Sequence, residues 1–135
     1  MDKIKIVIII FALVVSLLLL WTIASFVFFY DDSENLGGGY TYYPEQKDII
    51  GKQDIPPYIL EYKYNSDIIV VKQHPAELKD VMYTDYDYPL GRDTIYYWII
   101  DKDKQMLHGP LDYNTYVKEV KKYDKVPEIT ENGSE

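Results

Sequence analysis

The clearest structural signal in this sequence is Thr94-Ile-Tyr-Tyr-Trp-Ile-Ile100, followed by Asp101-Lys-Asp-Lys104 and then by Gln105-Met-Leu-His108. Seven consecutive apolar, aromatic or β-branched residues are typical of a central strand. Four polar residues between two apolar segments are typical of a turn, because their side chains tolerate and stabilise a tight reversal. The segment therefore predicts a β-hairpin whose first strand lies inside a sheet.

A second hairpin is predicted upstream. Residues 58–64 alternate in character, which places Tyr58, Leu60, Tyr62 and Tyr64 on one face of a strand. Asn65-Ser-Asp67 supplies turn residues, and Ile68-Ile-Val-Val71 predicts a strand that is covered on both faces. Shorter strands are expected at residues 40–43 and, as a partner, at residues 49–50.

A helix is predicted after the second strand of the downstream hairpin, where Gly109-Pro110 is expected to end that strand. Asp112 is a good N-cap, and Tyr113, Tyr116, Val117 and Val120 form one apolar stripe at helical spacing. A further short helix is expected at residues 75–82, with Pro75 in its first turn. The expected fold class is α+β: a small antiparallel β-sheet domain with a C-terminal amphipathic helix packed on it.

An uncharged, apolar run occupies residues 6–30. As a helix its 25 residues span roughly 37 Å, which exceeds the bilayer's hydrocarbon core of about 30 Å. Lys3 and Lys5 precede the run, whereas Asp31, Asp32 and Glu34 follow it. The positive-inside rule then predicts a single-pass anchor in the cell membrane, with the N-terminus cytoplasmic and the C-terminal domain extracytoplasmic.

Two alternatives remain open for this run. Thr22-Ile23-Ala24 has the small-x-small pattern of a signal-peptide cleavage site, but cleavage there would leave an apolar N-terminus, residues 25–30, without an evident partner. The run could also be a buried helix of a soluble domain. With the anchor interpretation, we expect a cytoplasmic N-terminus at 1–5, a transmembrane helix at 6–30, a linker at 31–39, an extracytoplasmic domain at 40–126 and a flexible tail at 127–135.

Charge and composition exclude several classes of function. Residues 31–135 carry 12 Lys and Arg against 21 Asp and Glu, a net charge of −9, which argues against nucleic acid as a partner. The absence of cysteine excludes disulfides, thiolate nucleophiles and cysteine-ligated metals. Ser33, Ser66 and Ser134 lie in the linker, a turn and the tail, and no nucleophile or phosphate-loop motif is present. We therefore expect that the protein is not an enzyme and binds no cofactor.

The most unusual polar segment is Tyr83-Thr-Asp-Tyr-Asp-Tyr-Pro-Leu-Gly-Arg-Asp93. Its carboxylates could bind calcium, and exposed tyrosine rings could stack on a sugar or a protein partner. The plainer interpretation is a polar loop whose tyrosine rings lie on the sheet. The candidate partner-contact residues are Tyr83, Asp85, Tyr86, Asp87 and Tyr88.

Two weaker metal candidates are present. His74, Glu77 and His108 could hold zinc, but no zinc-binding motif links them, so surface histidines are the preferred interpretation. Asp101-Lys-Asp103 begins like a calcium loop, but Gln105 and Met106 stand where a further ligand and the turn glycine should be. A solvated hairpin turn is therefore expected there.

Four segments, in order, resemble an uncharacterised family of small bacterial surface proteins: Leu36-Gly-Gly-Gly-Tyr40, Ile68-Ile-Val-Val-Lys-Gln-His-Pro75, Tyr97-Trp-Ile-Ile100 and Gly109-Pro-Leu111. The likeness spans residues 36–127 and implies no assigned activity. Many such proteins look like lipoproteins, whereas this chain lacks the lipid-acceptor cysteine. Residues 98–116 also resemble, more loosely, part of the small proline-rich-peptide-binding domains with a Gly-Tyr-Phe signature, which supports the strand–strand–helix order.

These observations lead to one expected function and two alternatives. We expect a non-catalytic module, anchored in the lipid bilayer through residues 6–30, that binds an envelope protein or a surface polymer. The alternatives are an accessory structural subunit of a membrane complex and, less favoured, a small hydrolase. The sequence identifies neither the ligand nor the oligomeric state.

Overall fold

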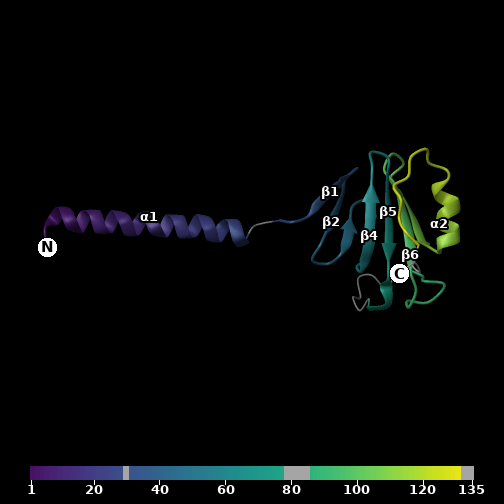
Figure 1. Cartoon of the computed structure of the whole chain (residues 1–135), viewed down its shortest axis with the longest axis horizontal. Helices are drawn as coiled ribbons and strands as arrows, with labels where there is room; N and C mark the ends of the chain where they lie inside the picture. The colour runs from purple at the N-terminus through teal and green to yellow at the C-terminus, as the bar shows by residue number, and fades with distance from the viewer. Residues whose placement is uncertain (29–30, 78–85, 132–135) are drawn as a thin grey trace. The chain divides into compact units, whose positions relative to one another are not determined.

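The computed structural model describes residues 1–28, 31–77 and 86–131, and it divides the chain into two compact units, Met1–Asp32 and Ser33–Glu135. The first unit holds one helix, and the second holds two antiparallel sheets and a short helix (Figure 1). The predicted α+β class is confirmed.

The first unit is helix α1, Lys3–Phe28. The most apolar 18-residue window of the helix has a mean hydropathy of 3.1, and none of the residues of α1 is buried. Two of its polar side chains are satisfied within the helix, since the Ser16 and Thr22 hydroxyls donate to the carbonyls of Leu13 and Leu19 at 2.9 and 2.8 Å. The helix is therefore long enough and apolar enough to cross a membrane.

The second unit begins with a three-stranded sheet in the order β1-β2-β3, made of β1 (Glu34–Gly37), β2 (Tyr40–Tyr43) and β3 (Asp48–Ile50). The predicted strand at 40–43 and its partner at 49–50 are confirmed. The linker predicted at 31–39 is wrong for Glu34–Gly37, which form β1. Leu36 explains the difference: it is the one apolar side chain in this polar stretch, and it is only 1% exposed.

Polar contacts fix β1 to distant parts of the domain. The Glu34 carboxylate accepts hydrogen bonds from the hydroxyls of Tyr62 and Tyr64, and these bonds lower the pKa of Glu34. The buried Lys102 ammonium donates to the carbonyls of Leu36 and Asn65. These contacts are specified by tertiary structure, so the local sequence did not reveal them.

The larger sheet has four antiparallel strands in the order β4-β5-β6-β7. Its strands are β4 (Ile59–Tyr64), β5 (Ile68–Gln73), β6 (Tyr96–Asp101) and β7 (Met106–Leu111). Every residue of β5 and β6 is buried, which confirms the two strands that were predicted to be central.

Each face of the four-stranded sheet packs against a different layer (Figure 1). One face joins the three-stranded sheet in a first core cluster that includes Leu36, Tyr40, Ile49 and Trp98. The other face packs against helix α2, Tyr113–Val120, in a second core cluster that contains Tyr97 and Tyr116. Asp112 caps this helix as predicted, because its side chain accepts from the Thr115 amide at 2.7 Å.

Two predictions about the strands are wrong in detail. The β4–β5 register shifts at Leu60, so Leu60 is exposed, not aligned with Tyr62 as the alternation predicted. Strand β7 does not stop at Gly109-Pro110 but continues to Leu111. Glycine is required here, because a Cβ at Gly109 would lie 2.5 Å from Cε3 of Trp98.

The C-terminal segment also differs from the prediction. Residues 127–130 are not a free tail: Ile129 is 8% exposed in the second core cluster, and the Thr130 carbonyl accepts from the Lys72 ammonium at 3.0 Å. The predicted boundaries of 40 and 126 are therefore too narrow. Of the helix predicted at 75–82, the structure has the short 3₁₀ helix η1, Pro75–Glu77, and the remainder lies outside the described residues.

Candidate functional site

The tyrosine-rich segment that the sequence favoured as a contact surface lies partly inside the core. Tyr83 and Asp85 are outside the described residues. The Tyr86 ring packs edge-on against Trp98 with ring centres 5.2 Å apart, and its hydroxyl donates to the Asp54 carbonyl at 2.7 Å. Tyr88 is buried beside Tyr96, and only Asp87 is exposed. For Tyr86 and Tyr88 the plainer interpretation, rings lying on the sheet, is the one observed.

A satisfied polar network surrounds these rings. The Trp98 indole donates to Oε1 of the fully buried Gln73 at 2.9 Å, and Nε2 of Gln73 donates to the Pro57 carbonyl at 2.9 Å. Buried polar groups that are paired in this way stabilise and orient a core. The network is structural, and it explains why a glutamine occupies the end of a central strand.

The residues considered as zinc ligands do not form a described site. His74 lies next to Asp93, with Nε2 3.2 Å from Oδ1. His108 lies on β7, and the Glu77 side chain is not described. Within residues 1–28, 31–77 and 86–131, no three His, Cys, Asp or Glu side chains are grouped to hold a metal ion.

The predicted turn after β6 is confirmed, and its first residue is the buried Asp101. The carboxylate accepts from the Lys104 amide at 3.0 Å and from the Tyr123 hydroxyl at 3.2 Å, and the Lys104 ammonium lies 3.8 Å away. The hydrogen bond from the Lys104 amide lowers the pKa of Asp101. Burial, together with the neighbouring Asp101 carboxylate, raises the pKa of Tyr123 to about 12.

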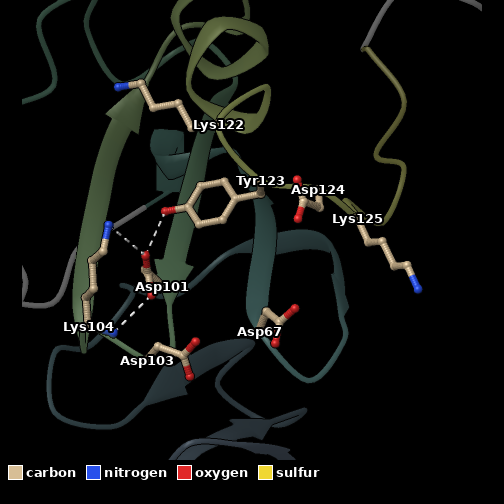
Figure 2. Close-up of a pocket in the computed structure, with 8 residues that line it drawn as sticks. All are labelled: Asp67, Asp101, Asp103, Lys104, Lys122, Tyr123, Asp124 and Lys125. Atoms are coloured by element: carbon tan, nitrogen blue, oxygen red, sulfur yellow. Dashed lines mark hydrogen bonds and ion pairs between the residues drawn. The ribbon is translucent and has the colours of Figure 1, made fainter.

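Asp101 is one of the residues that line a polar pocket of about 280 Å³. Figure 2 shows the Tyr123 hydroxyl and Lys104 directed at Asp101, whereas the ammonium groups of Lys122 and Lys125 point away. Four carboxylates and three ammonium groups line the pocket, which comprises Asp67, Asp101, Asp103, Lys104, Lys122, Tyr123, Asp124 and Lys125. The hydrogen bonds of the Asp101 carboxylate to Lys104 and Tyr123 connect the turn after β6 with the segment after α2. We therefore interpret the polar pocket as structural.

A second hollow, the Leu60 pocket, has a volume of about 250 Å³ and a different character. Three separate segments form it: the turn before β3, the start of β4 and the residues after β5. Its lining residues are Lys47, Tyr58, Ile59, Leu60, His74 and Ala76. None of these six is acidic, although the domain as a whole is strongly acidic.

Backbone hydrogen bonds hold the wall of the Leu60 pocket. The Ile59 amide donates to the Lys47 carbonyl at 3.0 Å, and the His74 amide donates to the Tyr58 carbonyl at 3.2 Å. Lys47 and Tyr58 both adopt positive φ angles, 54° and 72°, which are uncommon for residues with a side chain. Of these six residues the sequence identified only His74 as a candidate for function, because the register shift that exposes Leu60 has no local signature.

Comparison with known proteins places the second unit in a family. Residues 37–130, which include β2 to β7 and α2, match a family model described as "Protein of unknown function (DUF3997)". No curated protein and no solved structure matches the chain significantly. The expected likeness to an uncharacterised family, over residues 36–127, agrees with this match. The chain therefore belongs to the DUF3997 family of proteins of unknown function.

Proposed function

We propose that this protein is a single-pass membrane protein whose second unit lies outside the cytoplasm and binds a partner without catalysing a reaction. One observation carries the anchoring: α1 is a 26-residue apolar helix none of whose residues is buried, whereas the second unit has its own core clusters. A helix that is apolar all round needs an apolar surrounding, and a bilayer supplies one.

The flanking charges support the orientation. Lys3 and Lys5 lie at the N-terminal end of α1, and Asp31 and Asp32 follow its C-terminal end. Basic residues are retained on the cytoplasmic side, so the acidic second unit is directed outwards. An extracytoplasmic domain of this charge meets envelope proteins and surface polymers.

The geometry of the hollows supports binding more than catalysis. In the polar pocket the buried Asp101 carboxylate accepts hydrogen bonds from the Lys104 amide and the Tyr123 hydroxyl, which lower its pKa and give both of its oxygens partners within the protein. The Leu60 pocket is lined by apolar side chains with basic groups beside them, which suits recognition of a surface group.

Protease shaving of intact cells, combined with membrane fractionation of a C-terminally tagged chain, tests the anchoring and orientation. We expect the tag in the membrane fraction and its removal by external protease. A membrane-bound but protected tag that remains protected after outer-membrane permeabilisation would contradict the orientation. Release of the tag into the soluble fraction would indicate a cleaved signal peptide.

A matched variant separates an anchor from a signal peptide. Ala24→Leu removes the small residue of the candidate cleavage site without shortening the apolar helix. We expect the wild type and this variant to differ in mass only by the substituted side chain and to occur in the same membrane fraction. If Ala24→Leu alone converts a soluble product into a membrane-bound one, the wild-type segment is cleaved and the proposal fails.

Behaviour of the full chain in detergent tests the binding role against that of an accessory subunit. A binding module folds by itself, so we expect a monodisperse, cooperatively unfolding protein. An obligate subunit exposes a large apolar interface without its partner and aggregates. Aggregation of the purified chain would favour the structural role.

A further inference from the structure

We propose that the Leu60 pocket binds a segment of a partner protein that places one apolar side chain in the pocket and an adjacent carboxylate at Lys47. This inference rests on the proposed binding function and names the chemistry of the partner.

The wall of the pocket is apolar and partly exposed to solvent. Leu60 is 54% exposed, while its neighbour Ile59 is buried in the first core cluster. Leu60 is exposed because the β4 register shifts there, so its side chain lies beside the hollow and does not enter the core. Binding of an apolar side chain of suitable size would remove the exposed leucine surface from water, which favours association.

The positive charge of Lys47, beside the apolar wall, indicates that the partner segment also carries a carboxylate. Among the described residues that line the pocket, Lys47 and His74 carry the ionisable nitrogen groups, and none of the six is acidic. His74 is already engaged by Asp93 at 3.2 Å. Among the described residues no carboxylate lies within 4.0 Å of the Lys47 ammonium, so this group is available to an incoming carboxylate.

The pocket is formed before a partner arrives. The hydrogen bonds from Ile59 to Lys47 and from His74 to Tyr58 connect its three segments. Two non-glycine residues in its wall, Lys47 and Tyr58, hold positive φ angles, and such conformations persist where the surroundings enforce them. A preformed site loses little conformational freedom on binding.

The size favours one side chain. A volume of about 250 Å³ is below the roughly 300–1,000 Å³ that is typical of sites for whole small molecules. A long acyl chain would extend beyond the walls, whereas a single aromatic or aliphatic side chain fits within them. We therefore commit to a protein segment as the occupant.

The test measures binding of matched peptides to the full chain in nanodiscs, with isoleucine and leucine methyl groups labelled for NMR. The probes are Ac-Gly-Phe-Glu-Gly-NH₂, its Gln analogue and its Lys analogue. We expect saturable shifts of the Leu60 and Ile59 methyl signals, with affinity in the order Glu, Gln, Lys.

Variants assign the two halves of the site. Lys47→Glu should weaken binding of the Glu peptide about fivefold, the upper range for an exposed ion pair, and favour the Lys peptide. Leu60→Ser should weaken all three peptides alike. Lys121→Glu, at the C-cap of α2, makes the same charge change outside the pocket and should leave the order unchanged.

Three results would overturn the inference. No methyl shift with any peptide would show that the pocket does not bind such segments, and the shaving result would still decide the proposed topology independently. Equal affinity for the Glu and Lys peptides would remove the role of Lys47. Tighter binding of dodecanoate than of the Glu peptide would identify a lipid as the occupant.

Discussion

Replacement of Tyr40 by phenylalanine is expected to stabilise the domain. Tyr40 begins β2 and is 0% exposed in the first core cluster. No hydrogen-bond partner for its hydroxyl is present in the part of the chain that the structure describes. Burial raises the pKa of Tyr40, as expected for a hydroxyl removed from water. Tyr40→Phe removes this unpaired group and keeps the ring.

The magnitude follows from two opposing terms. An unpaired buried polar group costs about 1–3 kcal/mol, and that cost disappears with the hydroxyl. The lost oxygen leaves a small void, which offsets part of the gain. We expect a net stabilisation of about 1 kcal/mol, equivalent to a rise in Tm of about 4–8 °C for a domain of this size.

The assay is denaturant unfolding of the full chain in detergent micelles, followed by Trp98 fluorescence in a Trp21→Phe background. Tyr62→Phe is the matched control, because it removes a hydroxyl that donates to the Glu34 carboxylate. A bond to a charged group contributes about 1.5–3 kcal/mol, so this variant should lose stability. If Tyr40→Phe loses as much as Tyr62→Phe, the Tyr40 hydroxyl is bonded and the reasoning is refuted.

Three further predictions concern the stability of the same domain. Because the pKa of Glu34 is lowered, its contribution to the free energy of unfolding is complete above the unfolded-state pKa near 4.5 and is lost as the pH falls through the folded-state pKa. Glu34→Gln should therefore make the free energy of unfolding less dependent on pH in that range. Leu36→Ala should cost about 2–5 kcal/mol in urea unfolding if β1 belongs to the core, and almost nothing if residues 31–39 are a linker. Ile129→Ala should cost about 2 kcal/mol, whereas a free tail would give no change in thermal unfolding.

The elements that could be predicted are those whose sequence is locally consistent. Residues 68–71 and 94–100 are continuous runs of strand-forming residues. The first run lies within β5 and residues 96–100 of the second lie within β6, and every residue of these two strands is buried. Asp112 and the apolar stripe after it likewise specify α2 without help from distant residues. In these segments propensity, periodicity and capping agree.

The elements that could not be predicted depend on single side chains in polar surroundings. Leu36 and Ile129 stand among polar, glycine or charged residues, so only the final packing decides that each is buried. The Leu60 pocket is similar, since it combines three segments and a register shift that no local pattern encodes. The candidate contact residues Tyr86 and Tyr88 were proposed from composition, and composition does not distinguish a ring on the surface from one on the core.

The position of Ile129 in the second core cluster has a consequence for biosynthesis. The cover on the α2 face of the four-stranded sheet is complete only when the segment around Ile129 and Thr130 has been made, and that segment follows α2 in the chain. Chains emerge from the ribosome N-terminus first, so α1 is available to the membrane while the sheet still lacks this cover. The domain therefore completes its packing after the anchor has been synthesised. This last step takes place in the compartment that residues 126–131 reach.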